Sequence, residues 1–126
     1  MSHDVVADGL NMIKNANRAG KKNIEIKKIS NLLIEILKIM KHKDFIKKYK
    51  INSKEKTVEV TIGDLTECKA IKPRFSADKS QIEKYRRRYL PSRNTGTMII
   101  STNKGLMTHE EAMEGGIGGS LIAYFY

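Results

Sequence analysis

Five consecutive residues form the part of this sequence whose side chains are best suited to binding another polar molecule. They are Ser101, Thr102, Asn103, Lys104 and Gly105. Hydroxyl and amide groups donate and accept hydrogen bonds, lysine adds a cation, and glycine adopts backbone conformations that side chains exclude. This combination predicts a surface turn that hydrogen-bonds a polar ligand. The alternative is an ordinary connection whose side chains are only hydrated.

The flanking residues predict how this segment is presented. The apolar run 98–100 has the length and composition of a buried strand. Thr108 followed by Glu111 predicts a helix that opens with a capping box. We therefore expect a short exposed turn that leads directly from a strand into a helix.

The sequence offers little support for catalysis or for a metal site. His109 and Glu110 begin like a zinc-protease helix, but Met113 stands where the second histidine would be required. Ser101 has no evident base near it in the sequence. The glycine-rich stretch 115–119 lacks the Lys-Ser/Thr of a phosphate-binding loop, and we expect it to let the chain pass close to another backbone. We expect no enzymatic activity, metal ion or cofactor; a phosphate-handling enzyme built on this stretch is a minor alternative.

The chain is strongly basic. Its 126 residues include 24 lysines and arginines against 14 aspartates and glutamates, which gives a formal net charge of +10 and a pI near 9.7. Such a charge on a short chain indicates a polyanionic partner, with nucleic acid favoured over an anionic membrane surface. The sequence shows neither a membrane-spanning run nor a signal-peptide pattern, and its single cysteine, Cys68, fits a reducing compartment. We therefore expect an intracellular protein.

Further candidate contacts with nucleic acid are spread along the chain. A helix over residues 4–17, capped by Asp4, presents amide and cationic groups on one face. Four arginines and two tyrosines between residues 84 and 93 combine cations for phosphates with rings for base stacking. Solvated helix faces are the alternative in both places. The residues selected from these segments and from the basic stretch before them are Lys14, Asn15, Lys72, Arg74, Arg87 and Arg93.

The pattern of elements predicts an α+β protein of two small α/β domains. Residues 1–64 carry the order helix, strand, helix, strand, strand, and the second helix, capped by Ser30, has a strong apolar periodicity. Gly63-Asp64 breaks the pattern, and the composition changes after it. Residues 65–126 are predicted to form a mainly β domain with a short helix after Thr108 and a final strand over 121–126.

Several motifs together resemble one known family. They are residues 4–16, 70–75, 89–93 and 99–112 and the pair Gly118-Gly119. Nearly end to end, they are similar to the small-subunit ribosomal protein eight family in its archaeal and eukaryotic branch. The simple, lysine-rich composition favours the archaeal members.

The resemblance implies a structural role in the cytoplasmic small ribosomal subunit. The family binds directly to a helix in the central domain of small-subunit ribosomal RNA early in assembly, beside neighbouring ribosomal proteins. We expect a monomer off the ribosome and no membrane association. The alternative is a basic RNA-binding regulator of messenger RNA outside the ribosome.

The resemblance also implies roles for individual residues. Ser101, Thr102 and Asn103 would hydrogen-bond base edges and sugars, Lys104 would meet phosphate, and Gly105 would keep the backbone close to the RNA. Contacts to the RNA backbone would come from Lys14, Asn15 and Ser30. The loop before Ser30 departs from the family pattern, because Lys28 and then Ser30-Asn31 stand where the family usually has proline followed by Ser-Lys.

Overall fold

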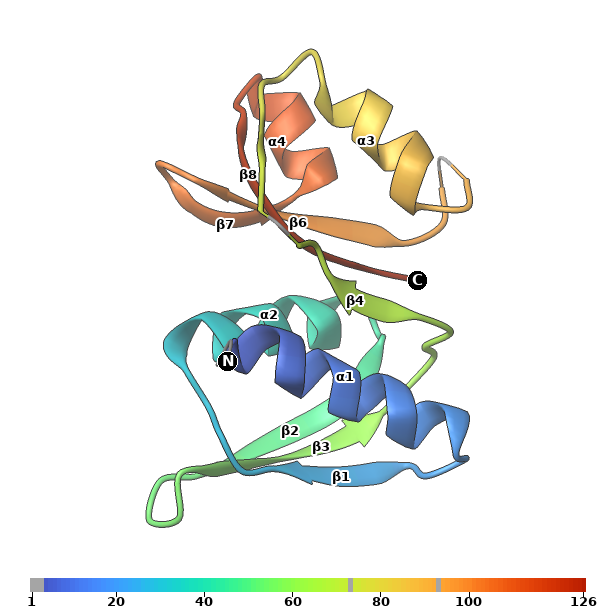
Figure 1. Ribbon diagram of the computed structural model, residues 1–126, viewed down its shortest axis with the longest axis vertical. Helices are drawn as coiled ribbons and strands as arrows, with labels where there is room; N and C mark the ends of the chain where they lie inside the picture. The colour runs from blue at the N-terminus through green and yellow to red at the C-terminus, as the bar shows by residue number, and fades with distance from the viewer. Residues whose placement is uncertain (1–3, 73, 93) are drawn as a thin grey trace. The chain divides into compact units, whose positions relative to one another are not determined.

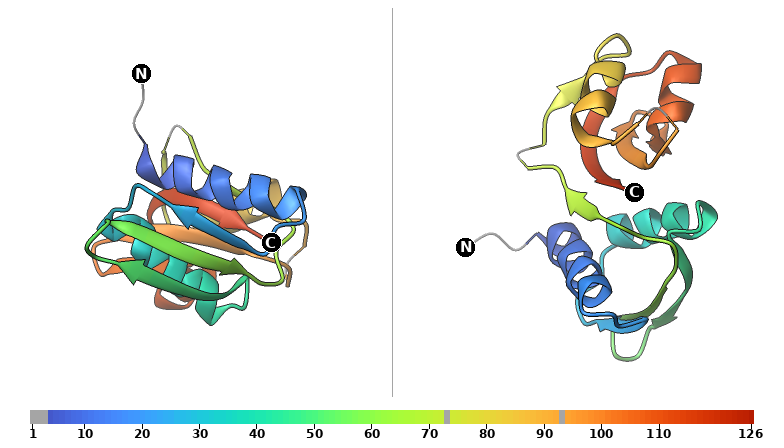
Figure 2. Two further views of the ribbon diagram at one scale, coloured as in Figure 1. Left: turned by 90° about the horizontal axis from the view of Figure 1, so that it is seen from below. Right: turned by 90° about the vertical axis from the view of Figure 1, so that its right-hand side faces the viewer.

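The computed structural model describes residues 4–72, 74–92 and 94–126, and the chain divides into two compact units, Met1–Lys69 and Ala70–Tyr126 (Figures 1 and 2). Each unit combines helices with an antiparallel sheet, which confirms the predicted α+β class. The division after Lys69 lies beyond the boundary expected at Asp64. The intervening segment belongs with the first helix, because Leu65 accepts a hydrogen bond from the Asn17 side chain (2.7 Å).

The first unit is a three-stranded sheet with two helices on one face (Figure 1). Alternating residues of the central strand, Val58, Val60 and Ile62, are buried toward the helices. The sheet order is β1-β3-β2, so β3, the last of these three strands in the sequence, lies in the middle. The predicted element order is confirmed as α1 (Val5–Arg18), β1 (Asn23–Ile26), α2 (Asn31–His42), β2 (Ile46–Asn52) and β3 (Thr57–Ile62).

Side-chain caps start both helices of this unit, as predicted. The Asp4 carboxylate accepts a hydrogen bond from the backbone N–H of Ala7 (3.1 Å), and the Ser30 hydroxyl accepts one from that of Leu33 (3.2 Å). Gly20, at φ +78°, terminates α1 in the left-handed conformation that glycine favours. Local hydrogen bonds therefore determine where these helices begin and end.

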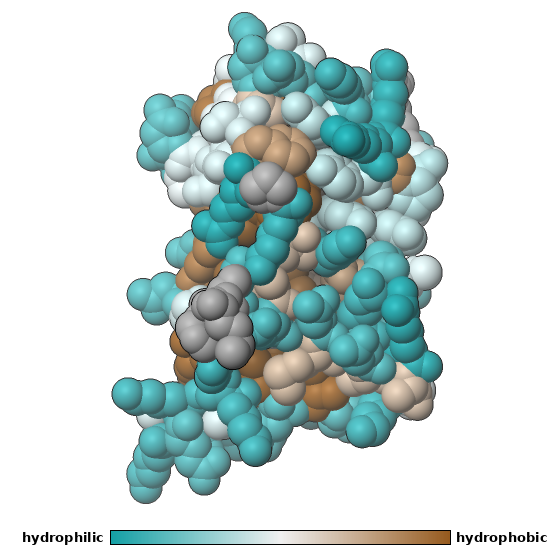
Figure 3. Space-filling model, in the orientation of Figure 1, coloured by the Kyte–Doolittle hydropathy of each residue, from teal (hydrophilic) through white to brown (hydrophobic). Residues whose placement is uncertain are grey.

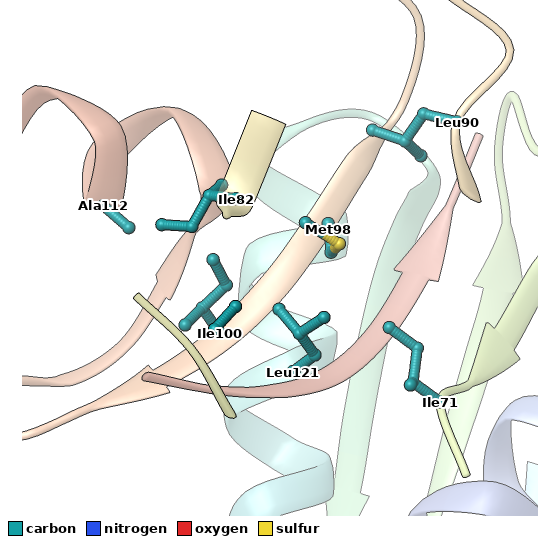
Figure 4. Close-up of a cluster of buried hydrophobic side chains, with 8 residues drawn as sticks. Ile71, Ile82, Leu90, Met98, Ile100, Ala112 and Leu121 are labelled. Carbon is teal, nitrogen blue, oxygen red and sulfur yellow. The ribbon is translucent and has the colours of Figure 1, made fainter. Parts of the chain in front are cut away.

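The rest of the chain adds a second sheet covered by two helices. Within the described residues the sheet has the order β4-β8-β6-β7, with β5 paired to β8. Ile82 of α3 and Ala112 of α4 share a buried cluster with Met98, Ile100 and Leu121, so both helices cover the same face (Figure 4). The elements are β4 (Cys68–Ala70), β5 (Ser76–Ala77), α3 (Ile82–Tyr89), β6 (Thr97–Thr102), β7 (Gly105–Thr108), α4 (His109–Gly115) and β8 (Gly119–Phe125).

Strand β7 was not predicted, and it changes the geometry of the polar segment. Its four residues pair antiparallel with the end of β6, so residues 101–105 form the tip of a hairpin and not a direct strand-to-helix link. The capping box that follows is confirmed, because Thr108 and Glu111 exchange both of its hydrogen bonds. A strand this short has too few residues to show alternation in the sequence.

The turn before helix α3 is closed by an aspartate that the sequence analysis missed, whereas the N-cap residue Gln81 makes no side-chain cap hydrogen bond. The Asp78 carboxylate accepts hydrogen bonds from the backbone N–H groups of Ser80 (3.0 Å) and Gln81 (3.1 Å), and from the Ser80 hydroxyl. These bonds, the hydroxyl bond above all, lower the pKa of Asp78. The described residues contain no helix long and apolar enough to cross a membrane, and no group of three or more potential metal ligands.

Cys68 packs against the first helix. Its thiol donates a hydrogen bond to the carbonyl oxygen of Leu10 (3.2 Å), and the residue is fully buried. Burial, and secondarily the negative charge of Glu67, raises the pKa of Cys68 to about 12. The single cysteine is therefore a core residue.

We expect Cys68 to be inert toward thiol reagents in the folded protein. The thiolate is the reactive form, and a pKa of about 12 leaves only about one thiol in ten thousand ionised at about pH 8, even before access is considered. Labelling with dithiobis(nitrobenzoate) should therefore be slow in native buffer and complete within seconds in denaturing guanidinium. Equal labelling rates in the two conditions would show that the cysteine is exposed.

Candidate nucleic-acid interface

The β6–β7 hairpin presents the five residues first selected from the sequence. Ser101 and Thr102 end β6, Asn103 and Lys104 form an exposed turn, and Gly105 begins β7. Gly105 has a φ of +104°, and a β-carbon there would meet no atom within 4 Å. Conformation and not crowding therefore requires glycine at this position. The backbone at the hairpin tip is open to the approach of a ligand.

Thr102 shapes the turn itself. Its hydroxyl donates a hydrogen bond to the carbonyl oxygen of Gly105 (2.9 Å) and accepts one from the backbone N–H of Lys104 (3.1 Å). The hydroxyl proton is therefore used inside the hairpin. The side chains left to contact a ligand at the tip are the Asn103 amide and the Lys104 ammonium group.

Ser101 belongs to a row of hydroxyl groups that crosses the sheet. The strand register pairs Ser76 of β5 with Ser120 of β8, and Ser120 with Ser101 of β6. Directly paired residues project from the same face of an antiparallel sheet. This face is the one away from α3 and α4, because the adjacent residues Ile100 and Leu121 point into the helix-covered core. We call Ser76, Ser120 and Ser101 the serine row.

The sequence analysis missed Ser76 and Ser120. Both lie far from the hairpin in the sequence and carry no motif of their own. Only the strand register brings them beside Ser101.

The pair Gly118-Gly119 allows the three strands of the serine row to approach each other. A β-carbon on Gly118 would lie 2.5 Å from the carbonyl oxygen of Ala77, and one on Gly119 would overlap the carbonyl oxygen of Ser101. Neither contact is possible for a real side chain. The glycines therefore let β8 pass close to neighbouring backbone, as expected, and they fix the position of Ser101.

Some of the side chains selected as RNA contacts in the first unit already interact with other groups of the protein. Lys14 Nζ lies 3.2 Å from Glu67 Oε1, and the Lys14 side chain is only 18% exposed. The other oxygen of Glu67 accepts a hydrogen bond from Arg18 (3.3 Å). Ser30 uses its hydroxyl oxygen as the cap of α2, whereas Asn15 is exposed on α1.

The arginines of α3 have different surroundings. Arg86 is 7% exposed, and its guanidinium donates to both carboxylate oxygens of Glu83 (3.0 and 2.7 Å). Arg87 lies 3.7 Å from the same carboxylate, with its side chain 71% exposed, and Arg88 is exposed as well. Arg86 therefore holds the fold together, while Arg87 and Arg88 face solvent.

The tyrosine rings expected to stack on bases pack within the second unit instead. The Tyr85 ring centroid lies 5.0 Å from that of Phe75, and the Tyr89 centroid lies 5.0 Å from that of Tyr124. All four rings cover the edge of the hydrophobic cluster. The stacking interpretation of this segment therefore loses its structural support.

Exposed cations occur in both units. Lys72 and Arg74 are exposed between β4 and β5, and the selected Arg93 lies outside the described residues. On the face seen in Figure 3, hydrophilic residues cover most of the surface, including the tip of the β2–β3 hairpin at lower left. Hydrophilic surface is thus widespread on this face, whereas the β6–β7 hairpin is a local and well-defined structure.

Comparison with known proteins finds related sequences that align along the whole chain. Residues 4–126 match the family described as Ribosomal protein S8. The chain is 44% identical to small ribosomal subunit protein uS8 of Nanoarchaeum equitans, 42% identical to that of Picrophilus torridus and 39% identical to that of Archaeoglobus fulgidus. Each of these alignments covers the whole of both chains. The chain therefore belongs to the ribosomal protein S8 family.

Proposed function

We propose that this protein is a structural component of the small ribosomal subunit and binds the subunit's RNA through the β6–β7 hairpin. The observation that carries the proposal is the hairpin tip, where an exposed amide and an exposed ammonium group precede a glycine with an open backbone. The net charge of +10 supplies the attraction to a polyanion. Membership of the family, and relatives named as small ribosomal subunit proteins, support the assignment.

A narrow hairpin suits irregular RNA. Regular A-form RNA hides its bases in a deep, narrow groove, so sequence is read where the helix is distorted and base edges are accessible. The small side chains of Ser101 and Asn103 hydrogen-bond base edges and sugars there. Lys104 meets a phosphate, Gly105 allows close approach of the RNA backbone, and Thr102 keeps the turn in shape.

Other groups add affinity without reading sequence. Asn15 and the cations Lys72, Arg74, Arg87 and Arg93 contact phosphates and sugars of the RNA. Lys14 and Ser30 contribute less, because an ion pair and a helix cap already occupy them. We assign recognition of RNA structure to the second unit, Ala70–Tyr126, and supporting backbone contacts to the first unit, Met1–Lys69.

The RNA target is a helix in the central domain of small-subunit ribosomal RNA. The protein joins it in the cytoplasm as a monomer, early in assembly and beside neighbouring ribosomal proteins. Its role is structural and not catalytic. His109, the histidine nearest the hairpin in sequence, is 1% exposed, and its Nδ1 accepts a hydrogen bond from the backbone N–H of Met98 (3.1 Å). No observation favours regulation of messenger RNA as a separate function.

The decisive experiment compares two RNAs. The dissociation constant is measured for a central-domain fragment and for a regular duplex of equal length, over a range of salt concentrations. We expect the fragment to bind orders of magnitude more tightly and to keep this advantage at high salt, because hydrogen bonds to bases depend less on counterion release. Coinciding curves would mean that charge alone explains the binding, and the proposal would fail.

Replacing Ser101 by alanine should weaken binding to the fragment by about 1–3 kcal/mol, the usual cost of a lost base contact. Thr102→Ala should cost a similar amount, because the turn loses its internal hydrogen bonds. Thr102→Ser keeps the hydroxyl and serves as the matched control, with an affinity near that of the wild type. Unchanged affinity of the Ser101→Ala variant would remove this hydroxyl from the interface.

Gly119→Ala should lower the ratio of the affinity for the fragment to the affinity for the duplex at least tenfold. The affinity for the duplex should be unchanged. The added methyl group would overlap the Ser101 carbonyl oxygen, so the end of β6 must move. Gly115→Ala is the control, because a β-carbon there meets only the flexible Ile117 side chain at 3.3 Å. Circular dichroism would verify that both variants fold. Full discrimination by Gly119→Ala would show that the position of Ser101 is unimportant.

Arg87→Gln should weaken binding to fragment and duplex equally and reduce the slope of log affinity against log salt by about 0.7–0.9. Arg86→Gln should instead lower the thermal unfolding temperature, because it removes the buried partner of Glu83. Salt titrations and thermal denaturation of both variants test this division of roles. If Arg87→Gln leaves the slope unchanged, its guanidinium does not contact phosphate.

A further inference from the structure

A groove between α3 and α4 is bordered by carboxylates, in contrast with the basic character of the chain. Glu83 of α3 and Glu110 and Glu114 of α4 line it, together with Met113. The two helices lie next to each other on one face of the second sheet (Figure 1). We call this depression the α3–α4 groove.

The carboxylates of the groove differ in how they are neutralised. Glu83 is bound by the buried Arg86 and approached by Arg87. Glu110 and Glu114 are exposed, and neither forms an ion pair with any residue in the described part of the chain. The groove therefore keeps two negative charges for which the described residues provide no ion-pair partner.

The placement of these two charges is unfavourable for the helix alone. Glu110 and Glu114 lie one turn apart on α4, where like charges repel. Glu114 also lies in the last turn, at the end of the helix that disfavours an anion, and that turn contains no basic residue. Such a departure from local preference is expected where a partner supplies the missing charge.

The apolar part of the groove fits the same kind of partner. Met113 lies between the two carboxylates in sequence and is 41% exposed, one of the few large hydrophobic residues that are exposed in the described part of the chain. Methionine adapts its shape to what it contacts. Lysine and arginine bury their methylene stems on apolar surface while their charged ends reach acceptors.

We propose that the α3–α4 groove binds a lysine- or arginine-rich segment of a neighbouring protein in the small ribosomal subunit. The cationic ends contact Glu110 and Glu114, and the stems lie over Met113. RNA phosphates are repelled by the same carboxylates. The inference rests on the proposed ribosomal function. Ser101 projects from the opposite face of the same sheet, so a contact between Ser101 and RNA does not occupy the groove.

The first test replaces Met113 by a photo-crosslinking amino acid in the full-length protein and assembles it into small subunits. We expect crosslinks to one lysine- or arginine-rich segment of a ribosomal protein, identified by mass spectrometry. Met12, also 41% exposed but not part of the groove, is the matched control and should not give the same crosslink. Crosslinks from position 113 to RNA, or none above those of a wild-type protein, would overturn the proposal.

The second test removes the two charges. Glu110→Gln/Glu114→Gln should enter small subunits about fivefold less well than wild type in competition, the size expected for two solvent-accessible ion pairs. Glu35→Gln/Glu55→Gln removes two exposed carboxylates elsewhere and should compete normally. Equal incorporation of the two double variants would overturn the groove proposal. Failure of all the proteins to bind the RNA fragment specifically would instead overturn the proposed RNA function, since that assay does not involve the groove.

Discussion

The close passage of β8 beside β5 and β6 determines the geometry of the candidate interface. Gly118 and Gly119 have no side chains, so their backbone lies against the carbonyl oxygens of Ala77 and Ser101. This contact sets the register in which three serines share one face, and it supports the strand from which the hairpin projects. A side chain at Gly119 would be incompatible with this packing, because a backbone carbonyl cannot yield as a flexible side chain can.

Charge contributes to the fold as well as to binding. Lys14 and Arg86, which the basic composition would assign to RNA, are engaged by Glu67 and Glu83 within the protein. A buried guanidinium left without its carboxylate would be strongly destabilising, so these pairs are structural requirements. The net charge of +10 already counts both members of these pairs, so the cations available to a polyanion are exposed residues such as Arg74 and Arg87.

Features that depend on local interactions were predictable from the sequence. The caps at Asp4, Ser30 and Thr108 satisfy nearby backbone groups, so each could be recognised within a few residues. The pairing of β7 with β6 and the row formed by Ser76, Ser120 and Ser101 depend on residues brought together by the fold. The inward orientation of Arg86 likewise depends on which face of α3 the core requires. Side-chain composition and family resemblance both pointed to residues 101–105 without revealing that they form a hairpin.

The hairpin is held rigidly, and this rigidity explains specific binding to RNA in a way that positive charge alone does not. Ser101 lies in a strand paired on both sides, by β7 and by β8. Thr102 closes the turn through two hydrogen bonds, and Gly105 adopts the required backbone angle at little steric cost. The polar groups are thus ordered before binding, so little conformational entropy is lost when RNA is bound. An equally basic but flexible loop would have to lose that entropy on every RNA, and it would fit a regular duplex as readily as a distorted helix.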